Sequence, residues 1–170
     1  VFVSGVGQAF GVVPSEVLSI DILPPYRAAS EELCGGAPEI IQAMLGSAVA
    51  QQFVGEVIDA FAHRFGDNVD LVLKIPSPGQ LLRDVGLASS PSFDELDDIG
   101  IALSNVLRKF SEKPIAGVLI ATTQPITEEE AEALESVVGA ARHYGWQVSM
   151  SFDGPGTLRL PLGLAEIRFD

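Results

Sequence analysis

The chain has 170 residues, which is the size of one domain and enough to bury a substantial core. Its 10 Lys and Arg residues stand against 23 Asp and Glu residues, giving a formal net charge of -13. Such a charge repels nucleic-acid backbones and anionic lipid surfaces, so we expect neither nucleic acid nor a membrane as a partner.

The remaining bulk features predict a soluble protein without a metal centre. No apolar run reaches the roughly 18 to 20 residues that span a bilayer, and the sequence does not open with the pattern of a secretory leader. Cys34 is the single cysteine, which excludes an internal disulfide and a zinc site built from several cysteines of this chain. The two histidines, His63 and His143, lack metal-ligand spacing. We expect a cytoplasmic protein with no metal and no cofactor.

Local patterns in the first part of the chain predict helices and a stiff connection. Pro14–Leu18 predicts a short helix, and the pair Pro24–Pro25 predicts an extended connection. Pro38–Phe65 predicts a long helical stretch that breaks near Gly46–Ser47, because its second half carries one apolar stripe at helical spacing.

Three apolar, β-branched runs follow: Val69–Ile75, Ile115–Ala121 and Trp146–Phe152. Each is too continuously apolar to leave one face in water, as expected for strands of a parallel sheet. Between them, Phe93–Ser111 and Thr127–Tyr144 carry apolar residues at the spacing of helices. The alternation of strand and helix predicts a single α/β domain over the whole chain, built from parallel βαβ units with right-handed crossovers.

The stretch "IPSPGQLL" joins the first of these strands to a helix and allows two interpretations. Ser77, Pro78 and Gln80 have the spacing of a capping box, in which the hydroxyl and the amide satisfy free backbone donors. Alternatively, the helix begins at the carboxyl end of the strand, where free N–H groups favour an anionic ligand. Ligands of parallel α/β folds bind at that edge of the sheet.

Polar side chains follow the other two strands at the same edge. Thr122 and Thr123 come after the second strand and Asp153 after the third. Their hydroxyls and carboxylate either meet in one site at this edge of the sheet or serve as ordinary turn formers. The pairs Thr127–Glu130 and Ser92–Glu95 have capping-box spacing, so we assign them to helix starts and not to the site.

Two cations lie near this edge in the sequence. Lys74 stands inside an apolar strand, where an amine must reach solvent, pair with a carboxylate or line a cavity. Arg27 follows the Pro24–Pro25 pair and can clamp a substrate carboxylate or lie on the surface. Either cation is a candidate for holding an acidic ligand.

The three segments "IPSPGQLL", "IAGVLIATTQP" and "GWQVSMSFDG" together resemble the superfamily of uroporphyrinogen decarboxylases and cobalamin-independent methionine synthases, over roughly Ala48 to Gly154. The resemblance implies a TIM barrel with its site at the carboxyl ends of the strands. It also implies zinc held by His and Cys in the methyltransferase branch, or Arg and Asp holding a polycarboxylate in the decarboxylase branch. The zinc constellation is absent from this sequence.

A full (β/α)₈ barrel usually needs about 250 residues, so this length predicts either a partial barrel or an open doubly wound sheet. We expect a homo-oligomer, or completion by another chain. The expected function is a barrel-related enzyme domain of lyase, decarboxylase or transferase type that acts on a small organic acid. Asp153 is the predicted acid/base. The predicted substrate-binding residues are Arg27, Lys74, Ser77, Gln80, Thr122 and Thr123.

Two other functions remain open on the sequence alone. The first is a non-catalytic subunit that binds a ligand or a partner and keeps the sheet without the chemistry. The second is a flavodoxin-like domain that binds a phosphorylated ligand at "SPGQ".

Overall fold

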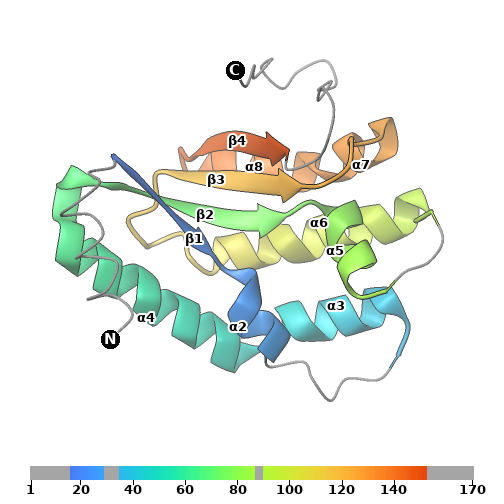
Figure 1. Cartoon of the computed structure of the whole chain (residues 1–170), viewed down its shortest axis with the longest axis horizontal. Helices are drawn as coiled ribbons and strands as arrows, with labels where there is room; N and C mark the ends of the chain where they lie inside the picture. Colours follow the sequence, from blue (N-terminus) through green and yellow to red (C-terminus); the bar gives the residue numbers. More distant parts are fainter. Residues whose placement is uncertain (1–15, 29–34, 87–89, 153–170) are drawn as a thin grey trace.

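The structure, a computed structural model, describes residues 16–28, 35–86 and 90–152 (Figure 1). The strands in this part are β1 (Val17–Asp21), β2 (Asp70–Pro76), β3 (Gly117–Thr122) and β4 (Gln147–Phe152). The helices are α2 (Leu23–Ala28), α3 (Ala37–Leu45), α4 (Ala48–Phe65), α5 (Pro78–Asp84), α6 (Phe93–Arg108), α7 (Glu128–Ala133) and α8 (Glu135–His143), with a 3₁₀ turn at Gly66–Asn68. Within these residues, no helix is both long and apolar enough to cross a membrane.

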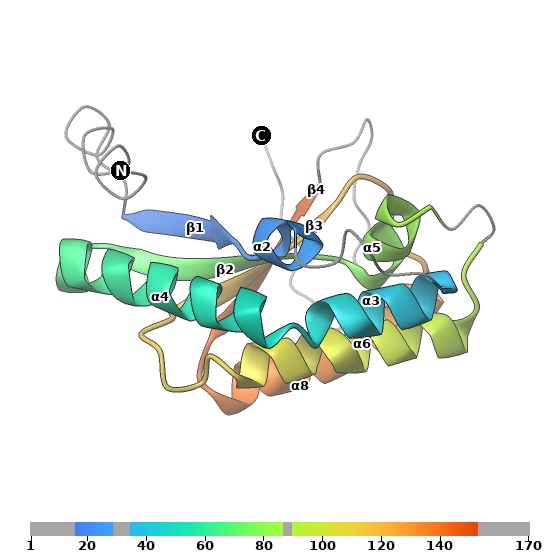
Figure 2. The ribbon, with the colours of Figure 1, turned by 90° about the horizontal axis from the view of Figure 1, so that it is seen from below.

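The four strands form one sheet in the order β1-β2-β3-β4, and every neighbouring pair is parallel. Helices α3, α4, α6 and α8 lie on the same side of the sheet (Figure 2). The predicted α/β fold with parallel βαβ units is therefore confirmed. The sheet of the described part is open and is not a closed barrel. Its long helices lie on one face, whereas the predicted doubly wound arrangement would have helices on both faces.

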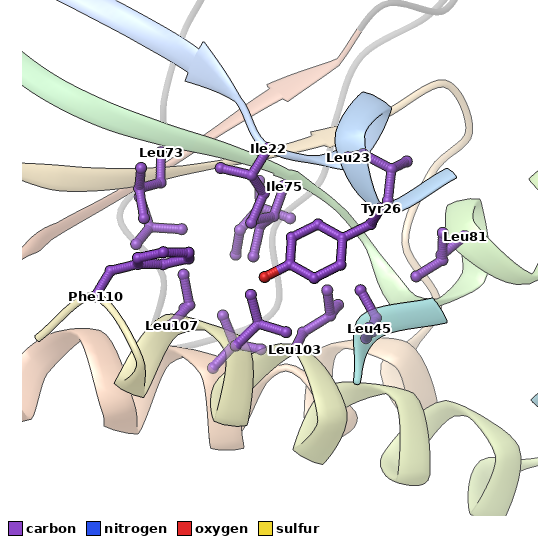
Figure 3. Close-up of a cluster of buried hydrophobic side chains, with 14 of the residues drawn as sticks. Ile22, Leu23, Tyr26, Leu45, Leu73, Ile75, Leu81, Leu103, Leu107 and Phe110 are labelled. Atoms are coloured by element: carbon purple, nitrogen blue, oxygen red, sulfur yellow. The ribbon is translucent and has the colours of Figure 1, made fainter. Parts of the chain in front are cut away.

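Alternation along the strands decides which side chains enter the core. Leu73 of β2 lies beside Ile20 of β1 and Val118 of β3, and all three side chains are on the helix-covered face. Against them pack apolar side chains of α6, such as Leu107, and Phe110 just beyond it (Figure 3). This apolar layer is the main source of stability, since burying one such side chain contributes about 1.5–3 kcal/mol.

Serine and threonine hydroxyls cap the N-termini of several helices. The Ser47 hydroxyl accepts from the Ala50 N–H at 3.3 Å, so the predicted break near Gly46–Ser47 is where α3 ends and α4 starts. The predicted Ser92–Glu95 capping box is complete, with both reciprocal hydrogen bonds present. The predicted helix over Thr127–Tyr144 is divided at Leu134 into α7 and α8.

Two predictions for the first part of the chain are wrong. Val17–Asp21 is strand β1 and not the end of a short helix, because its apolar side chains pair with the edge of β2 and tertiary contact overrides local propensity. Pro24–Pro25 lies in the first turn of α2, not in an extended connection. Proline fits there because the first N–H groups of a helix have no partner within the helix.

The second face of the sheet has no helix over it in the described part of the chain (Figure 2). Its side chains alternate with those of the core and include Ser19, Val72, Lys74, Leu119 and Ser149. These side chains are half-buried or exposed. The expectation that each strand is covered on both faces is therefore met on one face only by the described residues.

Tyr26 of α2 is the largest fully buried side chain of the core, and Figure 3 shows its hydroxyl directed toward α6. Burial raises the pKa of this phenol from 10.0 to about 12. The neutral form is favoured in the folded chain, whereas the unfolded chain ionises from about pH 10. Stability is therefore expected to fall as the pH rises from about 10 to about 12.

Replacing Tyr26 with phenylalanine is expected to remove this part of the loss of stability at alkaline pH, because the variant has no phenol at this position to ionise. Urea unfolding at pH 8 and pH 11 measures the effect. Tyr144→Phe is the matched control, since the Tyr144 side chain is only half-buried. Equal alkaline losses in wild type and Tyr26→Phe would contradict the assignment.

Candidate functional site

A pocket of about 210 Å³ opens at the carboxyl ends of β1, β2 and β3. It brings together residues that are far apart in the sequence, which the parallel strands deliver to one edge. Its polar lining residues are Asp21, Arg27, Lys74, Gln80, Asp84, Thr122 and Thr123. Five of the predicted substrate-binding residues therefore line one pocket.

Ser77 is fully buried and acts as a helix cap. Its hydroxyl accepts from the Gln80 N–H at 3.3 Å, and its own N–H donates to the Ala121 carbonyl at 2.9 Å. The backbone donor that a capping box would offer to Gln80 is thus used by β3. The cap predicted at "PSPGQ" is present without its reciprocal half, and the structure does not bring Ser77 into the pocket.

The Gln80 side chain instead crosses to the end of β3. Its Oε1 accepts from the Thr123 hydroxyl at 2.6 Å and from the Thr123 N–H at 3.1 Å. Its Nε2 donates to Asp84 at 2.7 Å, and Asp84 in turn pairs with the guanidinium of Arg27. A hydrogen-bonded chain of four side chains therefore connects α2, α5 and the end of β3 along one wall of the pocket.

Glu130 of α7 is a residue that the sequence did not place at this edge. It is only 3% exposed, and its Oε1 accepts from the Gly79 N–H at 2.8 Å. Thr127 does cap α7 by accepting the Glu130 N–H at 3.2 Å, but the carboxylate faces α5, so the predicted capping box is half formed. The anion-favouring start of α5 already holds a carboxylate of the protein itself.

A local signal for this contact existed at Gly79. A Cβ at this position would lie 2.8 Å from the Glu130 carboxylate oxygen, closer than real side chains approach. A glycine in the first turn of a helix is consistent with close approach of another group. Nothing in the run Glu128–Glu130 distinguishes the buried carboxylate from its two exposed neighbours.

Lys74 presents its ammonium to the pocket from β2. Its Nζ lies 3.8 Å from Asp21 Oδ2, which is an ion pair longer than a hydrogen bond, and the Lys74 side chain is 36% exposed. Asp21 is also engaged at its other oxygen, where Oδ1 accepts the Leu23 N–H at 3.1 Å. The Lys74 side chain therefore lines the pocket and makes a long ion pair with Asp21 within it.

The remaining predicted site residues have other environments. Thr122 is buried, and its hydroxyl donates to the Gln124 carbonyl at 2.8 Å and accepts the Gln124 N–H at 3.3 Å, as an ordinary turn former does. Arg27 is engaged with Asp84. Asp153 lies outside the described residues.

Among the residues that the structure describes, no group of three or more His, Cys, Asp or Glu side chains is placed to hold a metal ion. The polar side chains that line the pocket are two cations, two carboxylates, one amide and two hydroxyls around a small volume. No protein-family model, curated protein or solved structure matches the chain. The resemblance to the decarboxylase and methionine synthase superfamily stays a prediction.

Proposed function

We propose that the chain binds a small organic acid in the pocket at the carboxyl ends of β1, β2 and β3, with the ligand carboxylate on Lys74. The observation that supports this proposal is that Lys74 lines the pocket while its Nζ lies 3.8 Å from Asp21 Oδ2, which is longer than a hydrogen bond. Gln80 and Thr123 line the same pocket, where the Gln80 amide also donates to Asp84 and the Thr123 hydroxyl donates to Gln80, and they would meet a second polar group of the ligand. The volume of about 210 Å³ suits an acid of a few carbon atoms.

The proposed activity is that of a barrel-related enzyme of lyase, decarboxylase or transferase type, as the resemblance implies. In this proposal the positive charges of Arg27 and Lys74 offset the negative charge of the ligand, and Asp153 is the general acid or base of the reaction. Thr122 shapes the turn beside the pocket, and Ser77 holds the start of α5.

Replacing Lys74 with methionine is expected to weaken binding of dicarboxylates by about 10- to 100-fold, because one charge-assisted hydrogen bond is lost. Methionine keeps the apolar stem that crosses the sheet. The measurement is the rise in melting temperature caused by succinate and malonate, followed by calorimetric titration.

Lys113→Met is the matched control. Lys113 is also a partly exposed lysine, but it pairs with Asp59 at 2.6 Å away from this pocket. Loss of the protection in Lys74→Met and its retention in Lys113→Met are expected. Equal protection of both variants, or no protection of the wild type by any small acid, would contradict the proposed site.

The second candidate function is a subunit that binds a partner and has no chemistry of its own. The uncovered face of the sheet favours it, because parallel sheets are ordinarily covered on both faces. An unchanged thermal stability with every small acid, together with a stable complex with another chain, would favour this function over the first.

A further inference from the structure

A cleft of about 670 Å³ lies between α6 and the corner at which α3 ends and α4 begins. Figure 2 shows α3 alongside α6 and α4 continuing beyond the corner. The volume of the cleft is in the range of small-molecule sites. None of the described residues that line it also lines the carboxylate pocket, so the cleft is a separate candidate site.

One face of α6 forms a wall of the cleft. Its lining residues recur at the three- and four-residue spacing of neighbours on a helix face, and they are Asp98, Ile101, Ala102, Asn105, Val106 and Lys109. The Ile101 side chain is 44% exposed. Together with Leu45 of α3, the three apolar residues of this face give the cleft an apolar surface on which a flat ligand can lie.

The hydroxyl of Tyr26 is a buried polar group beside this surface. Tyr26 lines the cleft although it is only 1% exposed, and Figure 3 shows its hydroxyl directed toward α6. Among the residues that the structure describes, no group hydrogen-bonds to this hydroxyl, and burial alone raises its pKa. Most buried polar atoms of proteins have a partner, because an unpaired one costs free energy. An acceptor that enters the cleft would satisfy this hydroxyl.

Two glutamine side chains add amides to the lining. Gln42 of α3 and Gln51 of α4 line the cleft, and no hydrogen bond within the described part of the chain engages either side-chain amide. An amide presents a donor and an acceptor side by side, as the edge of a purine or pyrimidine ring does. The charged lining residues, Asp98 and Lys109, are of opposite sign and lie about 16 Å apart along α6. The lining therefore has no net charge.

We propose that this cleft binds an uncharged heterocyclic ligand of the nucleoside class. The ring lies on the apolar surface, an acceptor atom of the ligand takes the hydrogen bond of the Tyr26 hydroxyl, and the glutamine amides meet other polar atoms of the ring edge. The balanced lining favours a ligand without charge, and the net charge of -13 on the chain disfavours a phosphorylated one. The inference goes beyond the proposed carboxylate site and does not depend on it.

Calorimetric titration with adenosine and with uridine tests the site. We expect at least one of them to bind, at one molecule per chain. Tyr26→Phe removes only the hydroxyl and is expected to weaken that binding by about 3- to 10-fold, the effect of one lost hydrogen bond. The melting temperature of the unliganded variant at pH 7 should not fall, because no partner within the described residues loses a bond. Tyr144→Phe is the control, since Tyr144 does not line the cleft.

A second pair of variants tests the site without changing the core. Gln51→Ala is expected to weaken nucleoside binding by about 3- to 10-fold, because the amide of Gln51 lines the cleft. Gln52→Ala is the matched control on the next residue of α4. The Gln52 side chain is exposed and donates to Glu56 at 2.9 Å, outside the cleft, so wild-type affinity is expected for this variant.

No binding of either nucleoside to the wild type would show that the cleft holds only solvent, and would overturn the proposal. Unchanged affinity in both Tyr26→Phe and Gln51→Ala would overturn it as well. Lys74→Met separates this site from the carboxylate pocket, because it should lose protection by succinate and bind the nucleoside as the wild type does. Loss of nucleoside binding in Lys74→Met would place the nucleoside in the carboxylate pocket and refute the inference. Protection by succinate without nucleoside binding would refute the cleft alone.

Discussion

Replacing Gly100 with alanine is expected to lower the free energy of unfolding by about 3 kcal/mol, because overpacking against backbone cannot be relieved by a rotamer change. Gly100 is the point where α6 contacts α7. A Cβ at this position would collide with the backbone carbonyl oxygen of Ala133 and press on the Ser136 hydroxyl. Urea unfolding followed by circular dichroism measures the change.

Gly139→Ala is the matched control for this substitution. Gly139 is an exposed glycine in α8, and a Cβ there would meet nothing within 4 Å. Alanine should raise the stability by about 0.5–1 kcal/mol, since glycine in a helix interior costs that much relative to alanine. If both variants changed stability in the same direction, the close contact of α6 with α7 would be refuted.

Replacing Glu130 with alanine is expected to lower the free energy of unfolding by about 1–3 kcal/mol, because the buried Gly79 N–H would lose the carboxylate that accepts its hydrogen bond and would stay desolvated. Glu130→Gln keeps an acceptor oxygen and should cost less. The second readout is hydrogen exchange at the Gly79 amide, which is expected to accelerate in the alanine variant and to remain slow in the glutamine variant.

Glu128→Ala is the control for Glu130, since Glu128 lies in the same first turn of α7 but is exposed. A stability within about 0.5 kcal/mol of the wild type is expected for it. Equal losses for Glu128→Ala and Glu130→Ala, or unchanged exchange at Gly79, would show that the buried carboxylate does not hold the start of α5.

The strands β2 and β3 could be predicted because their runs are apolar and rich in β-branched residues. β4 was recognisable because apolar residues alternate with polar ones along it. The predicted run Val69–Ile75 differs from β2 by one residue at each end. The helices between them were recognisable from apolar spacing, and α6 begins at the predicted Phe93. These signals are local, so the sequence contains them without reference to the rest of the fold.

β1 and Glu130 could not be predicted, for a shared physical reason. β1 has one buried residue, Ile20, and its conformation depends on pairing with β2. The carboxylate of Glu130 is buried by α5, which lies 51 residues away along the chain. In both cases the deciding contact joins segments that are far apart in the sequence. No periodic pattern of apolar residues near β1 or near Glu130 reveals that contact.

The candidate site was predictable in position but not in detail. Arg27, Lys74, Gln80 and Thr123 do line one pocket, because the carboxyl ends of parallel strands meet at one edge. The partners within that pocket depend on side-chain geometry. Gln80 matches the spacing of a capping box, yet it bonds to Thr123 across the pocket.

The strand order β1-β2-β3-β4 also bears on how the chain is made. Each strand pairs with the strand that was synthesised just before it, so no strand has to be inserted between two existing ones. Short loops close at lower entropic cost than long ones, and contacts between nearby segments form fastest. Within the described residues, the sheet therefore grows at a single edge as the polypeptide emerges from the ribosome, and β4 is added to it after β3.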